Sequence, residues 1–357
     1  MYPPLTLRYL WELTDDTGLL QHAKYCVPDR REGYATDDNA RALVVVSKYF
    51  ALSRSRRVMR LAKIYLSFLH YMQRDDGSFY NKLSYDRLHK WDTSEDCYGR
   101  AIWGCSAVYA SPLPLELRRC AKEMLDRALS SVHRIRAPRG VAFTIIGLCE
   151  LWKSFHDERV ADLVERLASY LVELYESVAD EGWRWFEEII TYENARLPQA
   201  LFEAYLVTGE TQFLKVACEA FDFLKELTIV NGVFWPIGNR GWYQKGGERA
   251  LYDQQPVEAG SMVESSLSAF EATRDPKYLK VASVAMEWYF GRNSLRVNLY
   301  DEESGGCFDG ITPEGLNYNM GAEATLSYLL ARLKLEQARS YLGDYVFRYS
   351  SLRLRAI

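Results

Sequence analysis

The stretch "TDDNARALVVVSKYF" (residues 36–50) places two aspartates directly before a long apolar run. Thr36, Asp37 and Asp38 favour the start of a helix, because their oxygens accept hydrogen bonds from free backbone N–H groups and acids suit the positive end of the helix dipole. The residues that follow are apolar or small on nearly every side, which predicts a helix buried on most of its surface. One acid would be enough to start this helix, so the second needs another explanation.

Buried helices of this kind recur about 40 to 65 residues apart, the length of a helical hairpin with its loops. Amphipathic helices, apolar on one face and charged on the other, alternate with them. The linkers are short, as in "TGE" (208–210) and "TRDP" (273–276), so neighbouring helices must run antiparallel. The buried helices are expected at 40–52, 99–110, 140–152, 197–207, 256–270 and 320–333, and the amphipathic ones at 58–72, 117–128, 160–174, 213–224 and 278–289.

This alternation predicts an all-α fold, an (α/α)6 barrel in which six helical hairpins form a toroid. Glycine turns followed by aromatic residues, such as "DDGSFYN" (75–81) and "SGGCFDG" (304–310), predict short β pieces in the rim loops. We expect a single domain over residues 1–357. Within it, residues 1–35 contribute to the rim and residues 336–357 form a C-terminal extension.

The composition excludes several classes of function. A net charge of -4 without a basic block gives no electrostatic surface for nucleic acid. The N-terminus has no basic and apolar signal pattern, and no run of about 18 apolar residues exists, so neither secretion nor a membrane span is expected. The seven cysteines never form C-x-x-C and are interpreted as reduced thiols. A cytoplasmic location is therefore predicted, while the oligomeric state is not indicated.

Acidic residues gather where the buried helices begin and in the loops at the same rim. "DDNAR" (37–41) and "ENAR" (193–196) share an acid followed by Asn-Ala-Arg, and "EDCYGRA" (95–101) and "YDQQPVEAG" (252–260) hold equivalent places. Glycoside hydrolysis needs one carboxylic acid to protonate the leaving oxygen and one carboxylate to activate water or attack carbon. A like charge and a desolvating aromatic separate two such pKa values. The candidate catalytic residues are Asp37, Asp38, Asp96, Glu187, Asp253 and Glu258.

The substrate-binding candidates combine amides, which match the donors and acceptors of sugar hydroxyls, with tryptophans suited to stacking on sugar rings. For the arginines among them an alternative stays open, namely that Arg41, Arg100 and Arg196 form structural ion pairs with the rim acids. The candidates are His22, Lys24, Asn39, Arg41, Trp91, Arg100, Trp183, Trp185, Tyr192, Asn194, Arg196, Trp235, Asn239, Arg240, Trp242, Gln254, Gln255, Asn317, Asn319 and Glu323.

Other chemistries have weaker support. The five histidines are scattered, without H-E-x-x-H, so no metal site is expected. "DDNAR" is not D-D-x-x-D, "KGGE" (245–248) lacks the P-loop spacing, and G-x-S-x-G does not occur. No cofactor is predicted.

The motifs "DDNARAL", "EDCYGRAIWG", "WRWFEEIITYENARLPQAL", "WPIGNRGW", "YDQQPVEAGSMVE" and "NMGAEATL" resemble a family of prokaryotic (α/α)-barrel proteins. Its members are found beside or fused to glycosyltransferases and mannoside phosphorylases, and the family is similar to six-hairpin glycosidases and sugar 2-epimerases. The resemblance spans residues 14–335. It implies a carbohydrate-active enzyme with a functional link to a glycosyltransferase or glycoside phosphorylase, and it places the family's motif acids on the six catalytic candidates.

The main hypothesis is a glycoside hydrolase that acts on a short oligosaccharide, with mannosides as candidate substrates. One alternative is a sugar epimerase or isomerase of the same fold. In the sugar 2-epimerases histidines on barrel helices take the proton, so His22 would have to serve here. A second alternative is a non-catalytic sugar-binding partner of a glycosyltransferase, which needs tryptophans but no paired carboxylates. For the doubled aspartate we predict that Asp37 caps the helix and Asp38 faces the substrate.

Overall fold

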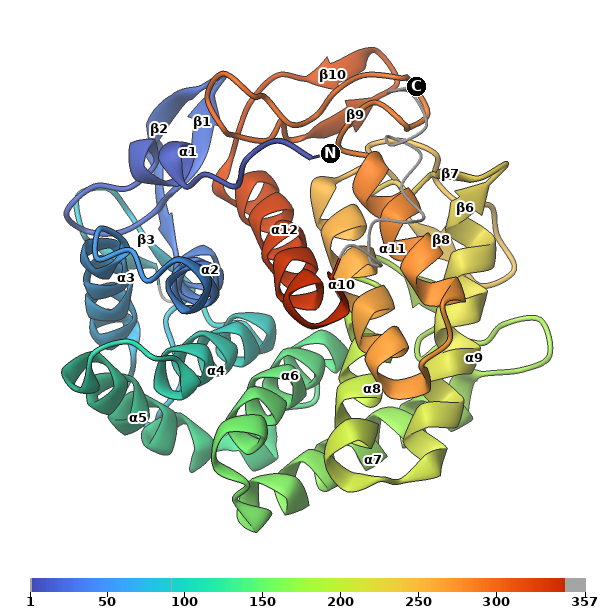
Figure 1. The fold of residues 1–357 in the computed structure, drawn as a ribbon, viewed down its shortest axis with the longest axis horizontal. Coiled ribbons are helices and arrows are strands. Elements are labelled where there is room, and N and C mark those ends of the chain that lie inside the picture. The colour runs from blue at the N-terminus through green and yellow to red at the C-terminus, as the bar shows by residue number, and fades with distance from the viewer. Residues whose placement is uncertain (1, 91, 344–357) are drawn as a thin grey trace.

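Six buried helices form a closed ring in the computed structural model, which describes residues 2–90 and 92–343. Each inner helix packs against the next, and the last packs against the first, so the ring closes (Figure 1). This arrangement confirms the predicted (α/α)6 barrel. The inner helices are α2 (Thr36–Ser53), α4 (Glu95–Ala110), α6 (Pro138–Phe155), α8 (Arg196–Thr208), α10 (Pro256–Thr273) and α12 (Ala322–Leu342).

Amphipathic helices form an outer layer, and each packs on the inner helix that precedes it (Figure 1). Within residues 2–90 and 92–343 there are five, whereas six complete hairpins would require six. The segment before α2 takes a different form, because it consists mainly of strands, and its short helix α1 (Arg8–Glu12) packs on α12. The outer helices are α3 (Val58–Met72), α5 (Leu115–Leu129), α7 (Glu158–Val178), α9 (Thr211–Thr228) and α11 (Lys277–Glu287), and a 3-10 helix η1 (Val132–Arg134) precedes α6.

Glycines allow the inner helices to approach closely. A Cβ atom added to Gly99 would lie 2.3 Å from the carbonyl oxygen of Gly140, and one added to Gly104 would lie 2.7 Å from that of Ala40. Real Cβ atoms do not approach backbone that closely, so α4 can pack against α6 and α2 in this way only with glycine at these places.

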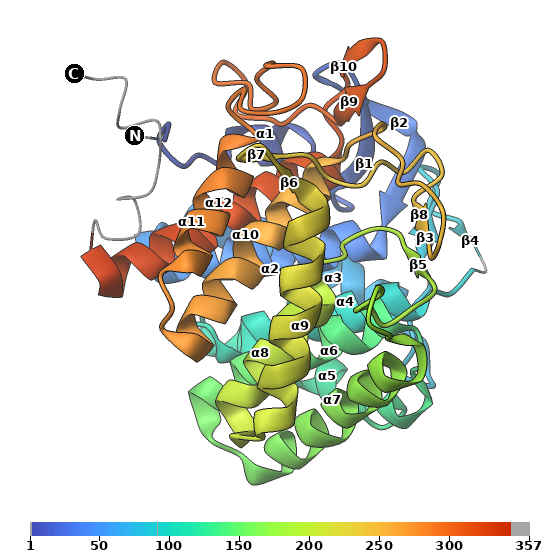
Figure 2. The ribbon, with the colours of Figure 1, turned by 90° about the vertical axis from the view of Figure 1, so that its right-hand side faces the viewer.

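Strands and long loops lie at the end of the barrel where the inner helices begin. In Figure 2 several strands lie on the right, while the C-terminal end of α12 lies on the left. The predicted short β pieces are confirmed, and the longest described strand, β2 (Val27–Ala35), lies in the segment before α2. All pairings are antiparallel, in the orders β1-β2-β3-β4, β5-β8, β6-β7 and β10-β9. The strands are β1 (Leu20–Lys24), β2 (Val27–Ala35), β3 (Lys82–Leu83), β4 (His89–Lys90), β5 (Ile189–Ile190), β6 (Ile229–Val230), β7 (Val233–Phe234), β8 (Tyr243–Gln244), β9 (Gly310–Thr312) and β10 (Gly315–Asn317).

The segment predicted as a C-terminal extension begins within α12. Residues 336–342 form the last turns of that helix. The rest of the proposed extension, residues 344–357, lies outside the described residues. No described helix has both the length and the apolar character that a membrane crossing requires.

Candidate functional site

A cavity of about 460 Å³ opens at the end of the barrel where α2, α10 and α12 begin. Its walls come from β1, the first turns of α2 and α12, the segment before α10, and the chain around β9 and β10. A volume of this size lies in the range of about 300–1,000 Å³ that is usual for small-ligand sites. The sequence-proposed residues that line it are His22, Asp37, Asp38, Arg41, Asn239, Arg240, Asp253, Gln254, Gln255, Asn317 and Glu323.

The two aspartates of α2 form ion pairs with arginines. Asp38 accepts a hydrogen bond from Arg41 at 2.8 Å, and Asp37 lies 3.3 Å from Arg100. The side chain of Asp38 is 3% exposed and that of Asp37 is 22% exposed. Burial and the adjacent Asp37 charge raise the pKa of Asp38 to about 8, although Arg41 opposes this shift.

The predicted capping role of Asp37 was wrong, whereas the role of Asp38 in facing the substrate stays a prediction. Among the described residues, no side chain forms a capping hydrogen bond at the start of α2. Asp37 is held by arginines instead of capping the helix, and it is the more exposed of the two. Both carboxyl groups line the cavity.

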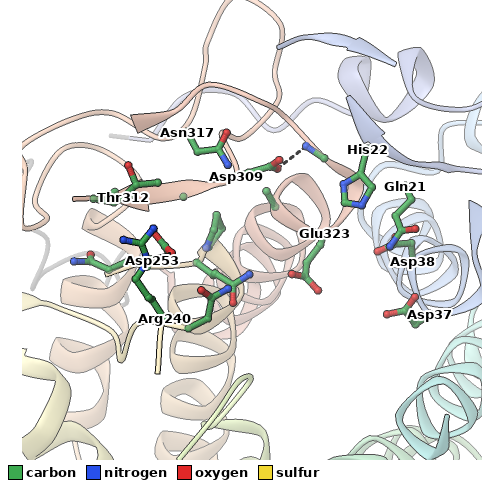
Figure 3. A pocket seen from close by; sticks show the side chains of 18 of the residues that line it. Gln21, His22, Asp37, Asp38, Arg240, Asp253, Asp309, Thr312, Asn317 and Glu323 are labelled. Atoms are coloured by element: carbon green, nitrogen blue, oxygen red, sulfur yellow. Dashed lines mark hydrogen bonds and ion pairs between the residues drawn. The ribbon is translucent and has the colours of Figure 1, made fainter. Parts of the chain in front are cut away.

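Asp309 lies between these aspartates and the opposite wall, beside His22 and Glu323 (Figure 3). Its Oδ1 accepts a hydrogen bond from the backbone N–H of Gly321, at the start of α12, at 2.6 Å. Burial is the main reason why the pKa of Asp309 is raised, and the Glu323 charge adds to it. The Gly321 N–H and His22 act in the opposite direction without cancelling the effect.

Asp253 lies on the wall opposite Asp37 and Asp38 (Figure 3). Its Oδ2 is 3.3 Å from the Arg240 guanidinium. Its Oδ1 is buried and has no hydrogen-bond partner among the described residues. A buried carboxylate oxygen without a partner is costly, so this oxygen is suited to hold a water molecule or a substrate hydroxyl.

A backbone bridge joins the segments that carry Asp253 and Asp309. Gln254 and Ile311 exchange two hydrogen bonds, with N···O distances of 2.8 and 2.9 Å. The Gln254 side chain has structural partners, because it donates to Leu251 and accepts from the Trp288 indole N–H at 3.3 Å. The bridge therefore sets the positions of the two carboxyl groups relative to each other.

Amide and hydroxyl side chains complete the lining. Asn239, Gln255 and Asn317 line the cavity as expected, together with Gln21 and Thr312. Such groups both donate and accept hydrogen bonds, which suits vicinal sugar hydroxyls.

The alternative of structural ion pairs is correct for the arginines below the cavity. Glu193 accepts from Arg100 and lies 3.2 Å from Arg196, which also donates to Glu264 at 2.6 Å. All four side chains are buried, and the two arginines lower the pKa of Glu193 to about 2 although burial acts against them. Arg100 and Arg196 are thus occupied by protein carboxylates and do not line the cavity.

Glu258 and Asn194 form another buried structural group. Asn194 donates to Glu258 at 2.8 Å, and Glu258 also accepts from the Glu193 backbone N–H. Burial raises the pKa of Glu258 to about 7. Neither residue lines the cavity, so neither has a direct contact there that would support its proposed role in catalysis or binding.

Asp96, Glu187 and Tyr192 also lie away from the cavity lining. Tyr192 donates to Asp96 at 2.6 Å, and Glu187 pairs with Arg139 at 2.8 Å. Three further polar candidates also lie outside the cavity. Asn39 is buried and hydrogen-bonded to the backbone of Leu19 and Ala35. Asn319 accepts a hydrogen bond from the Tyr25 backbone N–H, and Lys24 is exposed beside the Tyr25 ring.

The tryptophans do not form the predicted stacking surface. Trp183 and Trp185 are 3% and 0% exposed, because the glycine turn at residues 180–188 folds its aromatics into the core. Trp235 and Trp242 are partly exposed but lie outside the cavity lining. Trp91 lies outside the described residues.

The sequence reasoning missed Asp309, together with Gln21, Thr312 and Glu314, all of which line the cavity. A signal for Asp309 was present, since it belongs to the glycine turn "SGGCFDG" (304–310). Only the glycines and the aromatic residue of that turn entered the prediction, and its acid did not.

No protein-family model and no curated protein matches this chain. Solved structures of similar fold include cellobiose 2-epimerase from Bacillus thermoamylovorans, with a TM-score of 0.71 and 13% identity over 93% of this chain and 95% of that one. A D-mannose isomerase has a TM-score of 0.72 and 12% identity, over 93% and 94% of the two chains. The GH76 α-mannanase of Bacteroides thetaiotaomicron has a TM-score of 0.62 and 14% identity, over 87% and 88%. At these identities the similarity supports the barrel fold alone.

Proposed function

We propose that this protein is a carbohydrate-active enzyme, a glycoside hydrolase that cleaves a short oligosaccharide in the cavity of Asp253 and Asp309. The observation that carries the proposal is the different environment of these two carboxyl groups. Asp309 is largely buried with a raised pKa, whereas Asp253 is held by Arg240 and keeps one oxygen without a protein partner in the described chain. Two carboxyl groups with different environments are what acid–base cleavage of a glycosidic bond requires.

Asp309 is the proposed general acid. In its protonated form it donates a proton to the glycosidic oxygen as the bond from that oxygen to the anomeric carbon breaks. Asp253 acts at the other side of the sugar, where its free oxygen takes a proton from water as the water oxygen bonds to the anomeric carbon, or attacks that carbon directly. The carboxylates of Asp37 and Glu323 also line the cavity and would stabilise the positive charge that develops on the sugar ring.

The remaining lining supports recognition of a short sugar chain. Amides and hydroxyls surround the carboxyl groups, and Arg240 and Arg41 fix acids on two walls. A mannoside is our candidate substrate. It rests on the resemblance described above and on the similar fold of the GH76 α-mannanase.

The test is a screen of mannosides and glucosides with the wild-type protein, Asp253→Asn and Asp309→Asn. Loss of turnover in both variants, with native thermal unfolding, supports the proposal. Wild-type turnover in either variant removes that residue from the chemistry. Binding of sugar without turnover by the wild type would instead indicate a sugar-binding protein.

One observation favours a second candidate, a sugar epimerase or isomerase. His22 lines the cavity beside Asp309, and two of the similar solved structures carry epimerase or isomerase names. In this reaction His22 would take a proton from the carbon next to the sugar carbonyl. Incubation of mannose or cellobiose with the protein in deuterated water tests it, since an unlabelled carbon 2 rules the reaction out.

A further inference from the structure

A second and larger cavity, of about 730 Å³, lies at the opposite end of the barrel. All six inner helices contribute to it, most of them through their middle and C-terminal turns. The strands and loops of the first cavity are at the other end (Figure 2). Nothing in the reaction proposed above uses this second cavity.

Partly buried ion pairs line this cavity. Glu203 is 4% exposed and pairs with Lys153 and, at 3.4 Å, with Lys334. Lys334 also lies 3.5 Å from Glu271, and Ser268 donates to Glu203 at 2.6 Å. Lysines near helix C-termini also interact favourably with the helix dipoles, but this interaction does not explain why a cavity lies beside them.

The wall formed by α2, α4 and α6 carries further polar groups. Lys48 pairs with Glu150 at 2.7 Å, and Glu150 also accepts from the Trp103 indole N–H. Ser47, which is 2% exposed, lines the cavity with a hydroxyl that has no partner in the described part of the chain. A buried hydroxyl without a partner indicates that something else satisfies it.

The two cavities are separate sites. Asp37 lines the first cavity and Glu264 lines the second. Between them runs a buried chain of ion pairs, from Asp37 through Arg100, Glu193 and Arg196 to Glu264. The buried members of this chain of ion pairs separate the two cavities.

We propose that the second cavity is a binding site for a neutral saccharide, distinct from the proposed catalytic cavity. Its charged lining is balanced, with three lysines and one arginine against four glutamates. An ion that bound to the three lysines or the four glutamates would have to compete with pairs that already exist. A sugar hydroxyl accepts from an ammonium group and donates to a carboxylate at the same time, so it can bind beside an ion pair without breaking it.

The experiment is saturation-transfer NMR of the full chain with D-mannose, D-glucose, cellobiose and mannobiose. Thr312→Trp fills the first cavity, since Thr312 lines it, and is the background for all measurements. In that background, Ala51→Trp fills the second cavity from an exposed position on α2. Leu52→Trp is the matched control, because Leu52 is adjacent, 41% exposed and outside the lining. Ser340→Trp, from an exposed lining position on α12, is an independent second block.

We expect saccharide signal in the Thr312→Trp background that persists with Leu52→Trp and falls at least about 10-fold with Ala51→Trp and Ser340→Trp. No signal in the background, or signal that neither blocking variant reduces, would overturn the proposal. A parallel titration with inorganic phosphate distinguishes the ligand class: phosphate binding that the blocking variants abolish, without saccharide binding, would show an anion site instead. These outcomes do not depend on turnover, so they are independent of the proposed function.

Discussion

Gln254 and Ile311 lie 57 residues apart in sequence (311 − 254) and exchange two backbone hydrogen bonds at the rim of the barrel. The residues just before them in their two segments include Asp253 and Asp309, the carboxyl groups to which we assign the chemistry. Gly310 makes the bridge possible, because a Cβ atom there would lie 2.3 Å from the Gln254 carbonyl oxygen.

Gly310→Ala should therefore move Asp309 relative to Asp253. We expect a loss of stability of about 1–3 kcal/mol and a fall in turnover of about 100-fold, since misplacement of a catalytic group by about 1 Å has that effect. Gly315→Ala is the matched control: Gly315 has a φ of +135°, comparable to the +154° of Gly310, but no atom within 4 Å of its added Cβ. Denaturant unfolding and steady-state kinetics measure both effects, and equal losses of turnover in the two variants would contradict the role of the bridge.

The acid role of Asp309 predicts a dependence on the leaving group. Asp309→Asn should lower turnover of alkyl glycosides by about 10²–10⁴-fold, because an alcohol leaves poorly without a proton. Dinitrophenyl glycosides need little protonation, so the loss should be much smaller with them. Glu314→Gln, which changes another acid of the same cavity, is the control and should show no such difference. A loss in Asp309→Asn that is equal for both leaving groups would argue against an acid role.

The pH dependence of the reaction should reflect the ionisation of Asp309. A general acid works only while protonated, and a raised pKa extends that condition to higher pH. Wild-type kcat/KM should therefore fall on the alkaline side as Asp309 loses its proton. In Asp309→Asn the alkaline fall should disappear from the residual activity. A fall that is unchanged in the variant would assign it to another residue.

The raised pKa of Asp38 predicts that the stability of the protein depends on pH. Its folded-state pKa of about 8 is above its ordinary value of 3.8, so the folded state holds a proton that the unfolded state loses between these values. This group therefore lowers the free energy of unfolding as pH rises from about 4 to 8. Asp38→Asn keeps a neutral side chain at every pH and should be more stable than wild type at pH 8 by roughly 1–3 kcal/mol. Urea unfolding at pH 5 and pH 8 tests this, and a variant less stable at pH 8 would show that the ion pair with Arg41 dominates.

Trp185 should contribute to stability rather than to sugar binding. It is fully buried, so Trp185→Ala should cost about 3–5 kcal/mol of folding free energy. Trp185→Phe should keep sugar binding, measured by calorimetry, at the wild-type affinity. A weakened affinity in a natively folded Trp185→Phe would show that this tryptophan contributes to sugar binding.

The amino-acid sequence was sufficient to predict the barrel and the alternation of its inner and outer helices. Helical periodicity and short linkers are local properties, and they determine which helices are inner and which are outer. The same patterns placed acids at the starts of α2, α4, α10 and α12, where the structure has them.

Only the tertiary structure decided which acids share a cavity. The side chains of rim loops are directed by contacts between distant segments, such as the bridge that brings Asp253 and Asp309 together. The same contacts bury Trp183 and Trp185, although glycine turns with aromatics look alike in sequence whether the rings face the core or the solvent. Arg100 and Arg196 likewise had open roles until folding placed Glu193 between them, because a buried charge is stable only beside its partner.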